Sequence, residues 1–177
     1  KDLGNLQEAE LSVRKAIKIN PHVAVAHINL GAILKDLGNL QEAELSVRKA
    51  IEIKPDCADA YSSLGSILQD LGKLKEAELS TRKAIDLNPN FALAYSNLGS
   101  ILKDLGKPQE AELSTRKSVE LNPNSALSNS NLGFILKDLG KFSDAYKYFS
   151  SAEKYAPKNI FHFINSNLRL SPIMENN

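Results

Sequence analysis

Polar side chains that can bind another molecule recur in this chain at intervals of 34 residues. One series is uncharged and consists of Asn29, Ser63, Asn97 and Asn131. An asparagine amide carries N–H donors and a C=O acceptor, so one side chain can pair with the N–H and the C=O of a peptide together. Such a row can hold an extended backbone with little regard to its side chains. The alternative is that Asn and Ser are ordinary residues of an exposed helix surface.

A second series with the same interval is charged. It contains the aspartates Asp36, Asp70, Asp104 and Asp138, preceded by Lys35, Gln69, Lys103 and Lys137. An aspartate in the last turn of a helix faces the negative end of the helix dipole, which is locally unfavourable. Two explanations stay open. The carboxylates grip basic or amide groups of a ligand, or they form ion pairs with Lys or Arg of the adjacent repeat.

Repeated pairs of helices are the elements that position these residues. Residues 58–91 and 92–125 agree at 25 of 34 positions without gaps. Within a unit, apolar residues follow one helical stripe, a glycine suited to a helix C-terminus comes next, and a second stripe runs to a proline. Asn39 and Glu42 form a predicted capping box at the start of one second helix. The units are 1–23 (second half of a unit), 24–57, 58–91, 92–125, 126–159 and 160–177 (a capping helix and linker).

Composition and the remaining motifs narrow the classes of function. Lys plus Arg number 22 and Asp plus Glu 21, a balance that argues against a nucleic-acid partner. Cys57 has no second cysteine, and the three histidines lack metal-ligand spacing. No apolar run is long enough for a membrane span, and no catalytic motif is present. We therefore expect a cytoplasmic, all-α, non-enzymatic protein without a cofactor. The opening Lys-Asp-Leu-Gly, which lacks an initiator methionine, suggests an excerpt of a longer polypeptide.

The units resemble the tetratricopeptide repeat (TPR). The residues of 58–91 at the signature positions 4, 7, 8, 11, 20, 24, 27 and 32 are Tyr61, Leu64, Gly65, Leu68, Ala77, Thr81, Ala84 and Pro89. Position 24 is usually a large aromatic residue, which only the last complete unit has, as Phe149. The resemblance implies a right-handed α-solenoid of stacked antiparallel helix pairs, whose first helices line a concave groove. It also implies that this groove binds an extended peptide or a partner helix of another protein.

The resemblance also assigns the candidate groove residues, which lie on the predicted first helices. They are Asn29, Ser63, Asn97, Asn131, Asp36, Asp70, Asp104, Asp138, Lys35, Lys103, Lys137 and Phe134. Inner positions 2, 5, 6 and 9 carry no Lys or Arg, which disfavours the carboxylate clamp of chaperone co-factors. The asparagine row resembles that of O-linked N-acetylglucosamine transferases and SPINDLY-like proteins. A substrate-recruiting arm of such a glycosyltransferase is therefore an alternative to a binding scaffold.

The predicted second helices carry two further rows. Arg14, Arg48, Arg82 and Arg116 each follow a glutamate by four residues, the favourable order for a helical ion pair, which predicts solvent faces that neutralise themselves. The other row is Leu11, Leu45, Leu79 and Leu113. These leucines either support self-association of the chain or pack against the next helix pair.

Overall fold

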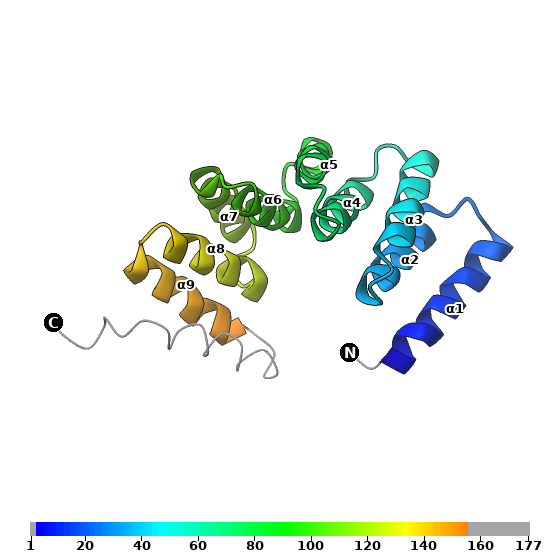
Figure 1. The fold of residues 1–177 in the computed structure, drawn as a ribbon, viewed down its shortest axis with the longest axis horizontal. Coiled ribbons are helices and arrows are strands. Elements are labelled where there is room, and N and C mark those ends of the chain that lie inside the picture. Colours follow the sequence, from blue (N-terminus) through cyan, green and yellow to red (C-terminus); the bar gives the residue numbers. More distant parts are fainter. Residues whose placement is uncertain (1–2, 156–177) are drawn as a thin grey trace. The chain divides into compact units, whose positions relative to one another are not determined.

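The computed structural model describes residues 3–155, which form nine α-helices and no strand (Figure 1). The helices are α1 (Leu3–Ile19), α2 (Ala24–Asp36), α3 (Leu40–Ile53), α4 (Ala58–Asp70), α5 (Leu74–Leu87), α6 (Ala92–Asp104), α7 (Pro108–Leu121), α8 (Ala126–Asp138) and α9 (Phe142–Tyr155). The predicted capping helix and linker at 160–177 lie outside the described residues. The chain divides into two compact units, Lys1–Asn97 and Leu98–Asn177.

Consecutive helices pack as pairs inside each unit. In the first unit α2 packs on α3 and α4 on α5, while α1 lies against α2 and α3 against α4. In the second unit α8 packs on α9 and on α7. This arrangement confirms the predicted all-α fold built from helix pairs.

A Leu-Gly turn ends every first helix at the predicted glycine. Gly38, Gly72, Gly106 and Gly140 have φ between 72° and 81°, the left-handed conformation that a side chain disfavours. After α2, the N–H of Asn39 donates to the carbonyl of Leu34 at 2.8 Å, which satisfies a carbonyl left open by the last turn. The turn returns the chain so that the second helix packs on the first.

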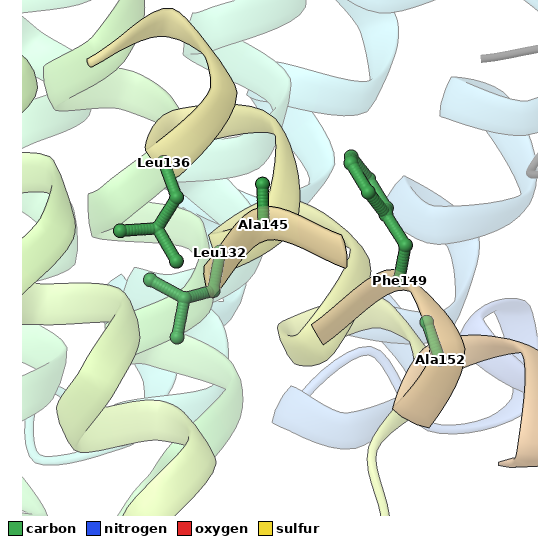
Figure 2. Close-up of a cluster of buried hydrophobic side chains, with 5 residues drawn as sticks. All are labelled: Leu132, Leu136, Ala145, Phe149 and Ala152. Carbon is green, nitrogen blue, oxygen red and sulfur yellow. The ribbon is translucent and has the colours of Figure 1, made fainter. Parts of the chain in front are cut away.

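The two helices of a pair come closest where a glycine of the first helix faces the residue at position 24 of the repeat, which lies on the second helix. A Cβ added to Gly65 would overlap Thr81 Oγ1 and lie 3.2 Å from the carbonyl oxygen of Ala77. In the last pair, Phe149 fills this place within the cluster of Leu132, Leu136, Ala145 and Ala152 (Figure 2). The smaller residue at position 24 therefore brings α4 and α5 together with little side-chain volume between them.

The predicted capping box at Asn39 is wrong. Asn39 precedes α3 with φ −81° and ψ 59°, and its side chain makes no capping hydrogen bond. The carboxylate of Glu42, the other member of the box, instead accepts a hydrogen bond from Arg14 on α1. The carboxylate of Glu42 therefore pairs with Arg14 of the preceding repeat and does not form the local cap.

Candidate functional site

Polar contacts join the first helices of neighbouring repeats in the first unit. Lys35 Nζ on α2 donates to Ser66 Oγ on α4 at 2.7 Å and lies 3.4 Å from Asp70 Oδ2. Asn97, on α6, donates from Nδ2 to Ser62 Oγ at 3.2 Å. Asp70 therefore has the inter-repeat ion pair that one of the two explanations requires.

The three first-unit members of the amide row differ in how much of their hydrogen-bonding capacity is used. Asn29 is exposed and Ser63 is half-buried, and neither side chain bonds to another described residue. Asn97 is half-buried and keeps its Oδ1 and its second amide hydrogen after bonding Ser62. All three occupy the same register of successive first helices, and each keeps at least part of its surface exposed.

In the second unit, three candidate residues line a small hollow of about 20 Å³ between α6 and α8. The residues around this hollow are Ser100, Lys103, Asn131, Phe134 and Ile135. The ring of Phe134 packs edge-on against Phe149, with 5.0 Å between the ring centres. Sequence reasoning had named three of these residues as groove candidates without predicting that they meet.

The other charged candidates lie near the ends of their first helices. Asp36, Asp104 and Asp138 are exposed, and Lys137 is half-buried. Asp36 and Asp104 each have an interaction partner, so they are not free carboxylates.

On the second helices, a nearly buried glutamate binds two cations. Glu44 pairs with Arg48 of its own helix at 2.7 Å and with Lys73, ahead of α5, at 2.8 Å, while 12% of its side chain stays exposed. The hydrogen bond from Lys73, followed by that from Arg48, holds the pKa of Glu44 below its usual value. Arg48 also reaches Glu76 at 3.4 Å, so the cluster joins two repeats.

The same cluster recurs in the second unit. Glu112 pairs with Lys141 at 2.7 Å and with Arg116 at 2.9 Å. The hydrogen bond from Lys141 is the main reason that the pKa of Glu112 is also lowered. Arg116 further donates to the hydroxyl of Tyr148 at 3.2 Å. The prediction that each glutamate pairs with the arginine four residues later is confirmed. The lysine of the next repeat was not predicted, although it follows the glutamate by 29 residues in both clusters.

The leucine row of the second helices is exposed, which rules out packing against the next helix pair. Leu11, Leu45, Leu79 and Leu113 are 61%, 68%, 70% and 71% exposed. The preceding residue in each case is the glutamate of a Glu–Arg pair, whose side chain is only 12% to 21% exposed. One residue further, the helix has turned by about 100°, so the leucine faces solvent.

Two other kinds of site are absent from residues 3–155. No helix there has the length and apolarity to cross a membrane. In the same range, no three His, Cys, Asp or Glu residues are placed to hold a metal ion.

Comparison with known sequences assigns the family. Tetratricopeptide repeat profiles match residues 58–91, 81–112, 2–68 and 126–159. The chain belongs to the tetratricopeptide repeat proteins, a family whose fold serves as a scaffold for protein–protein interaction. A search of the curated proteins found no match.

Solved structures of the same fold support this assignment. TTC0263, a thermophilic TPR protein of Thermus thermophilus, is 22% identical with a TM-score of 0.85, over 95% of this chain and 93% of that one. MamA is 26% identical with a TM-score of 0.69, over 86% of this chain and 89% of that one. YrrB, described as a TPR protein with an unusual peptide-binding site, is 24% identical with a TM-score of 0.64, over 89% of this chain and 85% of that one.

Proposed function

We propose that this protein is an interaction module whose first helices bind an extended segment of a partner polypeptide. The observation that carries the proposal is the set of Asn29, Ser63 and Asn97, which keep hydrogen-bonding groups available at one register of successive helices. An extended segment presents backbone N–H and C=O groups at regular intervals, so amides and hydroxyls suit it without a fixed side-chain sequence.

The internal bonds of the first helices favour this function. Because Asn97 is bonded to Ser62 and Lys35 to Ser66, two of the side chains near the row are already ordered. A ligand that binds ordered side chains loses less conformational entropy than one that must order them. Lys35 is paired with Asp70, so this region offers few free charges and selects weakly by charge. The peptide-binding site named for YrrB is a precedent for such binding on the same fold.

A peptide selection tests the proposal. We would select binders to the chain from a random peptide library displayed on phage, synthesise the enriched peptides and measure affinity by fluorescence anisotropy. The combined substitutions Asn29→Ala, Ser63→Ala and Asn97→Ala should weaken binding at least about tenfold, since each lost hydrogen bond contributes about 0.5–1.5 kcal/mol. The matched control is Leu79→Ser on the exposed face of α5, which should change the affinity little. Equal loss in both variants, or full affinity of the triple variant, would contradict the proposal.

The exposed leucine row favours a second candidate function, self-association through the second helices. Three leucines of the first unit, Leu11, Leu45 and Leu79, leave much apolar surface in contact with water. Sedimentation at several protein concentrations, with the chain and with Leu45→Ser/Leu79→Ser, tests this candidate. An apparent mass that does not rise with concentration would exclude it.

A further inference from the structure

The lysine at position 12 of the 34-residue repeat, near the end of the first helix, has different surroundings in the two compact units. In the first unit, Lys35 bonds to the hydroxyl of Ser66 and to Asp70. In the second unit the equivalent lysine is Lys103, and Phe134 stands where Ser66 would be. A phenyl ring cannot accept the hydrogen bond that a serine hydroxyl accepts.

The ammonium of Lys103 consequently lacks a partner among the residues that the structure describes. It forms no hydrogen bond or ion pair with any residue of 3–155. Asp138, the equivalent of Asp70, does not come within the 4.0 Å of an ion pair. The lysine side chain is half-buried, so part of its contact with water is also lost. A half-buried cation without a partner favours an anion from outside.

The hollow beside Lys103 fits one oxygen atom. Its volume is about 20 Å³, enough for a water molecule or one oxygen of a carboxylate. Ser100, Lys103 and Asn131 supply polar walls, while Phe134 and Ile135 supply apolar ones. The edge-on contact with Phe149 holds the ring of Phe134 in place. The apolar walls exclude water from one side of the ammonium, which strengthens a charge-assisted hydrogen bond.

We propose that this hollow binds the side-chain carboxylate of an Asp or Glu in the partner segment, next to an apolar residue that packs on Phe134. The carboxylate would pair with Lys103 Nζ. This inference rests on the proposed function and adds to it the chemistry of the partner. The first unit would then contribute contacts to the backbone, and the second unit would select for an acidic residue beside an apolar one.

The test extends the phage selection described above. Sequences selected on the unaltered chain should show an Asp or Glu adjacent to an apolar residue at one position. Lys103→Met keeps the length of the side chain and removes its charge, and it should lower the affinity of these peptides about tenfold, the usual effect of losing a charge-assisted hydrogen bond. Lys49→Met is the matched control, because Lys49 lies on α3, outside the candidate groove, and already pairs with Glu52 at 2.7 Å. It should change the affinity by less than about twofold.

Peptide variants identify which group binds. Replacing the enriched Glu by Gln should weaken binding to the unaltered chain about tenfold and should have little further effect on Lys103→Met. Amidation of the peptide C-terminus should change nothing. Loss of binding on amidation alone would assign the hollow to a terminal carboxylate and overturn the proposal.

The remaining outcomes separate this inference from the function on which it rests. If the peptides bind through Asn29, Ser63 and Asn97 but contain no enriched acidic residue, only the inference about Lys103 fails. If neither the amide substitutions nor Lys103→Met reduces binding, or if the library yields no binder, the proposed function fails together with it.

Discussion

Glu44 and Glu112 show how one residue serves two repeats. The side chain of each is only 12% exposed and accepts a hydrogen bond from an arginine one helical turn further on. Each also forms an ion pair with a lysine of the following repeat. Removing a carboxylate from such a cluster leaves cations without their acceptor, which costs more than losing a fully exposed pair. Residues that look like surface charges therefore contribute to the contact between repeats.

These two glutamates give the stability a defined dependence on acidity. The pKa of each is lower in the folded chain than its ordinary value of 4.5, so folding favours the ionised form. The resulting stability is complete above pH 4.5 and is lost as the pH falls through the folded pKa. We predict that Glu44→Gln and Glu112→Gln each lower the free energy of unfolding at pH 7 by about 1 kcal/mol. Both should also flatten its decline in acid.

Urea unfolding monitored by circular dichroism over a pH series measures both effects. The control is Glu52→Gln, whose side chain is 65% exposed and pairs only with Lys49 among the described contacts. This variant should follow the unaltered chain at every pH. The assignment would be wrong if Glu44→Gln retained the full acid dependence.

Gly65 gives a second prediction at the residue scale. Alanine normally stabilises a helix by about 1 kcal/mol relative to glycine. Here its Cβ would overlap Thr81 Oγ1, so we predict that Gly65→Ala destabilises the chain by about 2 kcal/mol. In a Thr81→Ala background the same substitution should cost clearly less, although the carbonyl of Ala77 remains close. Equal costs in the two backgrounds, measured by urea unfolding, would show that the hydroxyl is not the obstacle.

At the scale of elements, the sequence predicted the helices better than the contacts between their side chains. Apolar spacing, the Leu-Gly turn and the recurrent proline are local signals, and each recurs in every unit, so the helix pairs could be read directly. The ion pair of Glu42 with Arg14 replaced a cap that local sequence favoured. Lys103 and Phe134 line the same hollow because α6 packs near α8, and no local sequence pattern predicts this arrangement.

The helices also differ in how firmly they are held. No residue of α1 is buried. Among the described helices, α2 is the one with which α1 makes extensive contact. By contrast, α3 buries Ala43, Val47 and Ala50 and packs between α2 and α4. Elements with fewer buried contacts open at lower free energy, because less apolar surface is exposed on opening.

Hydrogen exchange followed by mass spectrometry tests this difference. We predict that amides of α1 exchange at least about 100-fold faster than those of the middle of α3, corresponding to roughly 3 kcal/mol in opening free energy. Equal protection of α1 and α3 would mean that the first unit opens as a whole and that burial does not rank its helices.

At the scale of the whole molecule, the family assignment and the polar first helices favour the proposed role, the binding of another polypeptide. The repeat supplies a series of equivalent positions, and substitutions at those positions give each unit its own chemistry: amides and a hydroxyl in the first, a lysine beside a phenylalanine in the second. The resemblance to the repeat arm of O-linked N-acetylglucosamine transferases stays a prediction, since the comparisons identify the repeat family alone.

The binding face can be mapped by nuclear magnetic resonance on isotope-labelled chain titrated with a peptide from the phage selection. Shift changes should concentrate at the exposed and half-buried positions of α2 and α4, including Asn29 and Ser63, and at Lys103 and Phe134. The amides of Leu11, Leu45 and Leu79 should move little. Shift changes centred on those leucines, with Asn29 and Ser63 unaffected, would place the partner on the second helices and contradict binding by the first.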